Sequence, residues 1–285
     1  MMDLLLAPFV AAMIILLTHA YFGLHIIQRG VIFVDLALAQ IAALGGTVGF
    51  LLGAEPGSDT IYLFSFGFTL LGALIFSGTR MKESPVPQEA LIGITYVVAS
   101  AAVLLLAGLT SEGSEHIRES LTGSLIWVTW PVVGKMVLSY GAVGLFHFLF
   151  RRPLLAITFS PKRDRRVFFW DLMFYASFGF AVTSSVNTAG VLMVFSVLVI
   201  PAVVAFFFTQ RFSRALWVAY GVGTAAIVLG LFISFTLDWA TGPVLVCSFG
   251  LFLLFALFLR PWFGVRVKSP EEARLVVRMF AEQDA

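Results

Sequence analysis

Two histidines, an aspartate and a glutamine stand within apolar stretches near the start of the chain: His19, His25, Asp35 and Gln40. An ionisable side chain inside a membrane costs a few kcal/mol or more, so such residues are candidates for function. Counted at the rise of a helix from the turn at Arg29, His19 and Gln40 would lie about 15 Å into a membrane. His25 and Asp35 would form a second level nearer the turn. This spacing predicts a ladder of nitrogen and oxygen donors along an antiparallel pair of helices, which could form an ion path.

A structural interpretation of the same four residues is also open. His19 and His25 can be neutral and hydrogen-bonded inside a helical bundle, and Asp35 can cap the start of the second span. For the two histidines the structural interpretation is favoured, and for Asp35 and Gln40 the path is favoured. Asp35 and Gln40 are five residues apart, about 140° around a regular helix, so one ion could not readily contact both without a local distortion.

A polar segment near the middle of the chain carries a second candidate group, Glu115, His116 and Glu119. The two glutamates are four residues apart and would share one face of a helix. The segment predicts an external amphipathic helix with an aromatic belt at Trp127 and Trp130, where aromatic rings commonly mark a membrane interface. The alternative is that Glu115, His116 and Glu119 form an external vestibule that captures a metal ion.

The composition predicts an integral membrane protein. The chain has 285 residues, of which 60% are hydrophobic and 12% charged, and its mean hydropathy is +0.98. Its single cysteine, Cys247, excludes a disulfide framework. A helix needs about 20 apolar residues to cross a membrane. This rule gives nine candidate spans: 4–27, 31–53, 60–78, 88–109, 126–150, 171–187, 189–208, 216–237 and 243–259.

The loops between these spans alternate in charge. Sixteen of the 18 basic residues fall in one set of loops, and acidic residues dominate the other set. Because basic loops usually remain in the cytoplasm, we expect an outside N-terminus and an inside C-terminus. The basic set comprises Arg29, Arg80, Lys82, Arg151, Arg152, Lys162, Arg163, Arg165, Arg166, Arg211, Arg214, Arg260, Arg266, Lys268, Arg274 and Arg278.

The expected fold is an all-α polytopic bundle of about eight to nine transmembrane helices. Residues 1–262 would form the membrane domain and residues 263–285 a short cytoplasmic tail. Glycines within the spans, such as Gly45, Gly72 and Gly223, would allow neighbouring helices to approach closely. The sixth and seventh spans touch at residues 184–190, whose small and polar side chains predict a turn or an unwound segment.

Familiar catalytic motifs are absent from the sequence. It contains no G-x-x-x-x-G-K-[ST] loop, no H-E-x-x-H and no G-x-S-x-G, so we expect neither nucleotide hydrolysis at a P-loop nor the enzyme chemistry of the other two motifs. The basic residues follow the topology and give no indication of nucleic-acid binding. A transport subunit that depends on a separate motor is favoured over a membrane-embedded enzyme or a structural scaffold.

Three blocks resemble the membrane permeases of metal-ion ATP-binding-cassette importers of the zinc, manganese and iron type. The segment 29–46 is similar to the second-span signature of that family, G-D-x-L-S-H-x-x-x-x-G. Residues 88–96 resemble its acidic-A-x-I-G block. Residues 187–202, followed by 237–243, resemble its V-G-x-L-L-V-x-A-L-L-x-x-P-A run and its later L-D-x-x-x-G-x block. The ordered set extends over roughly residues 4–260.

This resemblance implies a homodimeric permease in the bacterial inner membrane, surrounded by the lipid bilayer. A cytoplasmic subunit would bind ATP, and an extracytoplasmic binding protein would deliver a divalent zinc, manganese or iron ion. No cofactor is expected in this chain. The segment that would couple the permease to the ATPase includes Pro201, Gln210, Arg211, Phe212, Ser213 and Arg214.

One departure from the family signature concerns the ion site. The signature places Asp and His four residues apart, which puts both ligands on one face of a helix. Here Gln40 occupies the His position and Leu36 the Asp position, with Asp35 one residue earlier. An amide is a weaker ligand than imidazole for transition metals. A metal chelate or an organic solute is therefore the alternative substrate.

Overall fold

The computed structural model describes residues 2–55, 57–81, 86–108, 123, 125–159 and 165–263. Within these ranges, nine helices are long and apolar enough to cross a membrane, in agreement with the nine predicted spans. The helices are α1 (Met2–Arg29), α2 (Val34–Leu51), α3 (Asp59–Met81), α4 (Gln88–Ala107), α6 (Trp130–Leu149), α7 (Arg151–Phe159), α8 (Arg165–Ala189), α9 (Val191–Phe208), α10 (Phe212–Leu237) and α11 (Thr241–Phe263). The short helix α7 is the one that does not qualify as a span, and a single turn of 3-10 helix, η1 (Leu125–Trp127), precedes α6.

The predicted break near residues 184–190 is confined to one residue. Helix α8 continues to Ala189, and only Gly190, with φ of 80°, leaves the helical conformation before α9 begins. The polar residues fit within the helix because their hydroxyls donate to carbonyls four residues earlier: Ser185 to Ala181 at 2.7 Å and Thr188 to Ser184 at 3.2 Å. A positive φ is accessible to glycine without a steric penalty, so Gly190 alone makes the turn.

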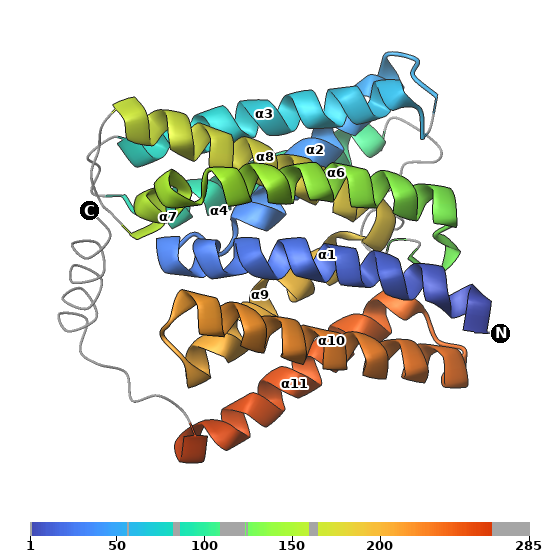
Figure 1. Ribbon diagram of the computed structural model, residues 1–285. Coiled ribbons are helices and arrows are strands. Elements are labelled where there is room, and N and C mark those ends of the chain that lie inside the picture. Colours follow the sequence, from blue (N-terminus) through green and yellow to red (C-terminus); the bar gives the residue numbers. More distant parts are fainter. Residues whose placement is uncertain are drawn as a thin grey trace.

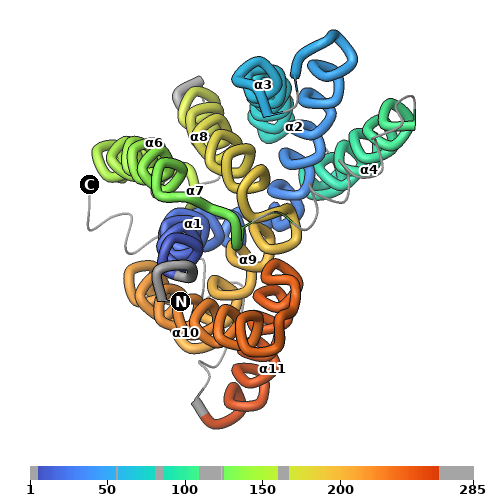
Figure 2. The backbone as a smooth tube through the Cα atoms, turned by 90° about the vertical axis from the view of Figure 1, so that its right-hand side faces the viewer, coloured from blue at the N-terminus to red at the C-terminus, as the bar shows by residue number. Residues whose placement is uncertain are grey.

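Helices α1 and α9 lie at the centre of the bundle. Viewed along the helices, α2, α3, α4 and α8 lie on one side of this central pair, and α10 and α11 lie on the other (Figure 2). Helix α1 packs chiefly against α9, α10 and α6, whereas α2 packs chiefly against α3, α4 and α8. The first two spans are therefore not the closely packed antiparallel pair that the sequence predicted.

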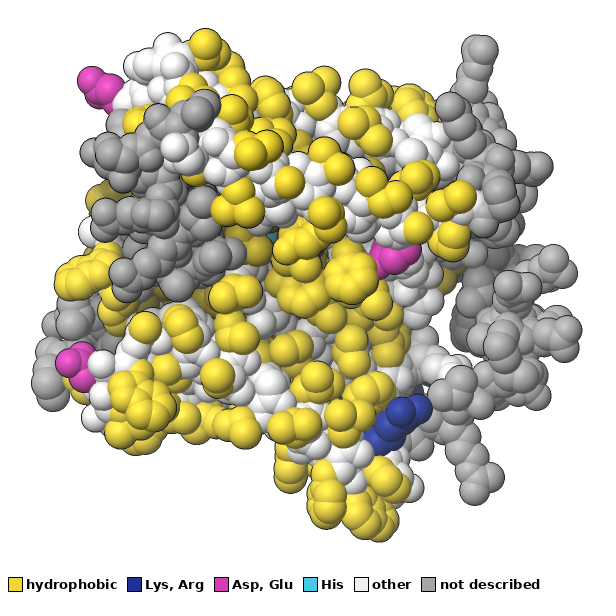
Figure 3. Space-filling model, turned by 180° about the vertical axis from the view of Figure 1, so that it is seen from behind, with side chains coloured by type: hydrophobic (Ala, Val, Ile, Leu, Met, Phe, Trp, Pro, Cys, Tyr) yellow, Lys and Arg dark blue, Asp and Glu magenta, His cyan; other side chains and the backbone are white. Residues whose placement is uncertain are grey.

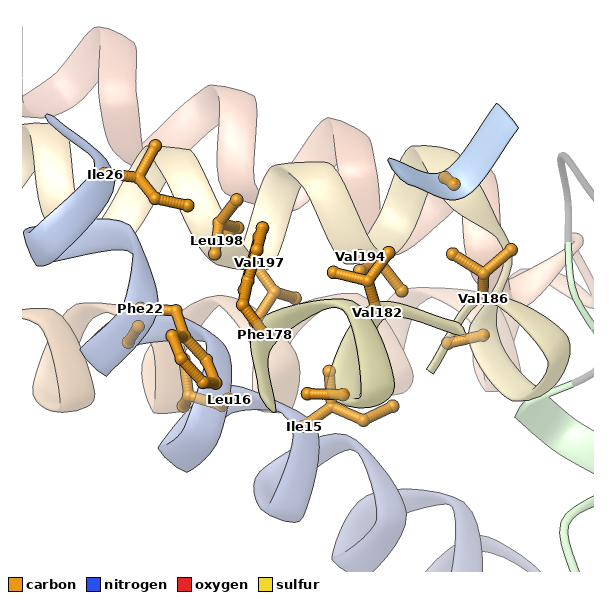
Figure 4. Close-up of a cluster of buried hydrophobic side chains, with 14 of the residues drawn as sticks. Ile15, Leu16, Phe22, Ile26, Phe178, Val182, Val186, Val194, Val197 and Leu198 are labelled. Atoms are coloured by element: carbon orange, nitrogen blue, oxygen red, sulfur yellow. The ribbon is translucent and has the colours of Figure 1, made fainter. Parts of the chain in front are cut away.

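The apolar core joins α1, α8 and α9. Phe22 and Ile15 of α1 lie beside Phe178 of α8 and Val197 of α9 (Figure 4), and all four side chains are fully buried. At Gly23 the α1 backbone approaches α9 so closely that an added Cβ would lie 1.9 Å from the Leu198 carbonyl oxygen. The absence of a side chain at this position permits the packing of the two central helices.

Large apolar side chains cover the outside of the bundle. The face opposite to that in Figure 1 is mostly hydrophobic (Figure 3). Leu105 on α4 is 75% exposed and Leu138 on α6 is 78% exposed. A water-soluble protein rarely exposes such continuous apolar surface. This surface therefore contacts the lipid bilayer.

The two ends of the bundle differ in charge. Helices α1, α3, α6, α9 and α11 end on the side where α2, α4, α8 and α10 begin (Figure 1). We call this side the basic end, because it carries Arg29, Arg80, Arg151, Arg211 and Arg260. Glu55, Asp59 and Asp238 lie at the opposite, acidic end. The structure thus preserves the charge alternation of the loops, while the side of the membrane that each end faces stays a prediction.

Replacement of Gly23 by alanine should loosen the contact between α1 and α9. Because the new methyl group would collide with backbone rather than with a flexible side chain, we expect a loss of about 1–3 kcal/mol of stability. Thermal unfolding of the protein in detergent measures this loss. Gly221→Ala is the matched control, since a Cβ there meets no atom within 4 Å. An equal unfolding temperature for Gly23→Ala and Gly221→Ala would contradict the packing.

Candidate functional site

The polar face of α1 begins with His19, which is fully buried. Its Nδ1 lies 3.0 Å from the Ile15 carbonyl oxygen and can bond to it only as a donor. Nε2 lies 3.3 Å from the Ser185 hydroxyl, which is 2.5 Å from the Tyr140 hydroxyl. These contacts join α1, α8 and α6 in the half of the bundle nearer the acidic end.

A second polar group surrounds His25 in the half nearer the basic end. His25 Nδ1 is 2.7 Å from the Thr158 hydroxyl of α7, and Nε2 has no partner among the described residues. The rings of Tyr21 and Phe212 pack edge-on against its imidazole. His147 of α6 contacts the Tyr21 hydroxyl at 3.2 Å and the Ser177 hydroxyl at 2.8 Å.

The structure does not join the four residues of the predicted ladder to one another. Within the described ranges, no hydrogen bond or ring contact links His19 or His25 to Asp35 or Gln40. Both histidines instead contact hydroxyls of α7 and α8. Their hydrogen bonds match the structural interpretation, and their part in transport stays a prediction.

Asp35 lies in the first turn of α2 but does not cap the helix. Its side chain is 1% exposed, and Oδ1 has no hydrogen-bond partner among the described residues. Glu89 of α4 reaches the residue before this helix instead, because its Oε1 accepts the Phe33 N–H at 3.0 Å. The carboxylate of Asp35 is therefore buried without the capping contact that the structural interpretation required.

Gln40 lies on a different face of α2 from Asp35 and is only partly buried. One turn before it, Leu36 contributes to an apolar groove of about 600 Å³ between α2 and α4, lined by Phe33, Leu36, Ala90, Gly93, Ile94, Tyr96, Val97 and Val98. The position at which the family signature has its aspartate is thus occupied here by an apolar side chain of a groove. Gln40 supplies an amide on the same face.

No cluster of three or more His, Cys, Asp or Glu residues that could hold a metal ion occurs within the described ranges. Glu115, His116 and Glu119, the predicted external vestibule, lie outside the described residues. Of the predicted ladder, the described spans hold a carboxylate, an amide and two buried imidazoles that do not contact one another.

The predicted coupling residues divide between a turn and a helix interior. Gln210, Arg211, Ser213 and Arg214 are exposed at the turn between α9 and α10. Phe212 is partly buried, and its ring centroid lies 4.9 Å from that of His25 and 6.2 Å from that of Phe159 on α7. Pro201 is buried inside α9, seven residues before the helix ends at Phe208. The turn can contact a partner, whereas Pro201 lies inside the bundle.

An ion cluster at the basic end was not among the predicted site residues. Asp171 of α8 is fully buried, and its Oδ1 accepts from Arg29 Nη1 at 3.0 Å and from Arg80 Nη1 at 2.5 Å. The lone acidic residue at the start of an apolar span was the available sequence signal. His147 was also missed, although an isolated histidine in an apolar span carries the same kind of signal.

Comparisons with known proteins place this chain among transport permeases. The model of the family described as ABC 3 transport family matches residues 1–260. The manganese import system permease protein ScaB of Streptococcus parasanguinis is 24% identical over 247 residues, covering 84% of this chain and 84% of that protein. The manganese transport system membrane protein MntC of Halalkalibacterium halodurans is 25% identical over 270 residues, covering 90% and 87%.

Two solved structures share the fold. PsaBC from Streptococcus pneumoniae in complex with Fab has a TM-score of 0.73 at 21% identity, covering 90% of this chain and 92% of that chain. An inward-facing conformation of a putative metal-chelate type ABC transporter has a TM-score of 0.64 at 15% identity, covering 89% and 85%. The fold of this chain therefore recurs in transporter structures with little sequence identity to it.

Substitution of either polar residue of α2 should reduce uptake. We expect Asp35→Asn and Gln40→Ala each to lower uptake of the transported substrate by about tenfold, the effect of about 1.4 kcal/mol of lost interaction. Uptake by whole cells, normalised to the amount of permease in the membrane, measures the effect. Thr95→Ala on α4 is the control, since its hydroxyl only bonds the Leu91 carbonyl of the same helix. Normal uptake in both α2 variants would remove these residues from the path.

Proposed function

We propose that this chain, which belongs to the ABC 3 transport family and is the membrane permease of an ATP-binding-cassette importer, carries a divalent transition-metal ion. Relatives of the same length are named as manganese permeases, and another, from Haemophilus influenzae, is named as a probable iron transport protein. Zinc has comparable ligand chemistry. The family assigns transport to this chain, and ATP hydrolysis would occur in a separate cytoplasmic subunit.

The observation that carries the metal proposal is the buried carboxylate of Asp35. One of its oxygens has no donor among the described residues, and a buried charged group without a partner is costly. A cation that passes α2 would supply the missing partner. Gln40, one and a half turns further into the membrane, and the imidazoles of His19 and His25 would provide weaker binding sites for the ion.

The apolar groove between α2 and α4 favours a second substrate class. Because Leu36 takes the position of the signature aspartate and lines the groove with aromatic and aliphatic side chains, the path beside α2 is less polar than a path for a bare ion would be. A metal chelate or an organic solute presents apolar surface that such a groove could accept. Gln40 would then hydrogen-bond the solute rather than ligate a metal.

The family and the charge of the two ends support a particular assembly. We infer a homodimer in the bacterial inner membrane, with an ATP-binding subunit at the basic end and a substrate-binding protein at the acidic end. The exposed residues Gln210, Arg211, Ser213 and Arg214 would contact the ATP-binding subunit. The tail 263–285 would lie on the same, cytoplasmic side.

Elemental analysis of cells with and without the gene distinguishes the two substrate classes. If the chain imports an ion, deletion of the gene should lower cellular manganese, iron or zinc at least severalfold in a medium that is low in that metal. Reintroduced wild-type permease should restore the metal, and the Asp35→Asn variant should not. Unchanged content of every metal, with loss of growth on an organic solute, would favour the organic solute. A fall in metal content only in medium that supplies the metal as a chelate would favour the metal chelate.

Cysteine labelling tests the orientation of the bundle. In a Cys247→Ser background, which removes the free cysteine on α11, Asp59→Cys should react with a membrane-impermeant maleimide in intact cells, because the acidic end should face outward. Gln210→Cys should react only after the membrane is opened. The reverse pattern of labelling would place the basic end outside.

Substitution of the turn between α9 and α10 tests the contact with the ATPase. In proteoliposomes that contain the complete transporter, Arg211→Ala combined with Arg214→Ala should reduce the stimulation of ATP hydrolysis by the loaded binding protein by about fivefold or more. Arg260→Ala serves as the control, because this arginine also lies at the basic end but its cation contacts the Phe207 ring of α9. Equal stimulation in the two variants would exclude the turn as the coupling segment.

A further inference from the structure

We propose that Asp171 and the residues bound around it form a mechanical joint that moves the basic ends of α1, α3, α7 and α8 together during transport. We define the basic-end joint as Arg29, Arg80, Thr158 and Asp171. The inference rests on the proposed function in one respect, namely that an ATP-binding subunit acts on the basic end. In this role Asp171 and Arg80 are positioning residues that never need to touch the substrate.

The geometry at Asp171 ties together three spans and the short helix α7. One carboxylate oxygen accepts from Arg29 of α1 and from Arg80 of α3, while Asp171 itself belongs to α8. The other terminal nitrogen of Arg80 donates to the Ile157 carbonyl of α7 at 2.5 Å. Charge-assisted bonds of this kind are directional and strong, so none of these helix ends can slide without breaking a bond.

Thr158 is the point at which α7 contacts α1. Its hydroxyl donates to the Leu154 carbonyl at 2.9 Å, so it accepts from its other neighbours. Those neighbours are His25 Nδ1 at 2.7 Å and two nitrogens of Arg29 at 3.4 Å. The Arg29 guanidinium also lies 3.7 Å from the centroid of the Phe174 ring. Arg29 is thus fixed on three sides, by α7, by the carboxylate and by an aromatic face of α8.

The residues of the joint are not the ones that would stabilise the fold most. Two cations share one anion, and the side chains of Arg29 and Asp171 are 2% and 0% exposed. Buried ion pairs commonly stabilise a fold less than apolar residues of the same volume would. Asp171 also uses one oxygen for both arginines, while Oδ2 has no partner among the described residues. What this arrangement provides is a fixed common position for four helix ends.

The joint also lies next to the turn that we assign to the ATPase contact. Phe212 lies among the exposed residues of that turn and packs its ring against His25 of α1 and Phe159 of α7. A displacement of the turn or of α7 therefore reaches α1, the central helix of the bundle. Through Asp171 and Arg80 the same displacement reaches α8 and α3. Contact at one surface can in this way move the spans on both sides of the bundle.

Arg80→Gln is the variant that tests the joint. It removes the link from α3 to α7 and α8 but leaves the buried pair of Arg29 and Asp171 neutral, so the bundle should fold. In proteoliposomes that contain the permease, its ATPase and its binding protein, we expect ATP hydrolysis to continue while manganese import falls. The ratio of ATP hydrolysed to manganese imported should rise by at least about fivefold. Arg260→Gln, at the same end but outside the joint, should keep the wild-type ratio.

A double variant separates position from charge. Asp171→Asn leaves two buried cations without an anion, whereas Asp171→Asn combined with Arg80→Gln restores the net charge of the wild-type cluster. We expect the double variant to recover thermal stability relative to Asp171→Asn and to remain uncoupled. A wild-type ratio of ATP to manganese in Arg80→Gln, or in the folded double variant, would overturn the joint, because Asp171 would then only neutralise charge.

A second measurement does not depend on the identity of the substrate. A bimane fluorophore on Gly78→Cys, in the Cys247→Ser background, reports on the basic end of α3 near Arg80, where an added Cβ meets no atom within 4 Å. Addition of ATP to the complex should change its fluorescence in the wild-type joint and not in Arg80→Gln. An equal change in both would refute the joint. Failure of wild-type manganese import with a normal bimane response would instead count against the proposed substrate.

Discussion

The burial of one carboxylate among the ends of several spans is the constraint on which the basic half of this permease depends. Asp171 lies between Arg29 and Arg80, which are 142 and 91 residues away in the sequence. A charged group that is removed from water needs partners, so the ends of α1, α3 and α8 must converge on it. The short helix α7 is drawn to the same place through Thr158 and the Ile157 carbonyl.

Helix α1 combines this polar constraint with the apolar core. One part of its surface carries His19, His25 and Arg29, whose contacts reach α6, α7 and α8. Another part carries Ile15, Phe22 and the close approach at Gly23, which bind it to α8 and α9. A helix that contacts neighbours on so many sides can occupy only the centre of the bundle. A shift at its basic end therefore displaces the helices that contact it. The candidate path along α2 lies outside this centre, beside α4.

The fold could be predicted largely from the sequence because length, hydropathy and loop charge are local properties. The nine spans and the alternating charge of their loops could be predicted from these properties. The turn between α8 and α9 was placed to within a few residues. The hydroxyls of Ser185 and Thr188 suggested a longer break, but they are satisfied by carbonyls of their own helix, so Gly190 makes the turn alone. Hydropathy cannot show which helices are neighbours. The pairing of His19 and His25 with Asp35 and Gln40 therefore rested on adjacency in sequence, whereas the packing of α1 and α2 is against other helices.

The site was harder to predict for the same reason. Asp171 and Arg80 look like ordinary residues at a membrane interface, and only their long-range contacts reveal a buried cluster. Glu89 likewise resembles a helix-start residue, yet it serves the start of α2 rather than only its own helix. Asp35 and Gln40 stood out because a carboxylate and an amide are unusual within an apolar span. They also differ in environment, since Asp35 is buried and Gln40 is only partly buried, and their role in a path stays a prediction.

The central requirement of the basic-end joint is that α1 and α7 move as one unit. Spin labels at Gln28 on α1 and Ala156 on α7, both exposed, would report the distance between these helices in the assembled transporter by double electron–electron resonance. We expect one narrow distance distribution that is the same with and without ATP, and a broad distribution in Thr158→Val, which removes the hydroxyl that His25 and Arg29 both contact. A distance that changes with ATP in the wild-type protein would contradict the joint.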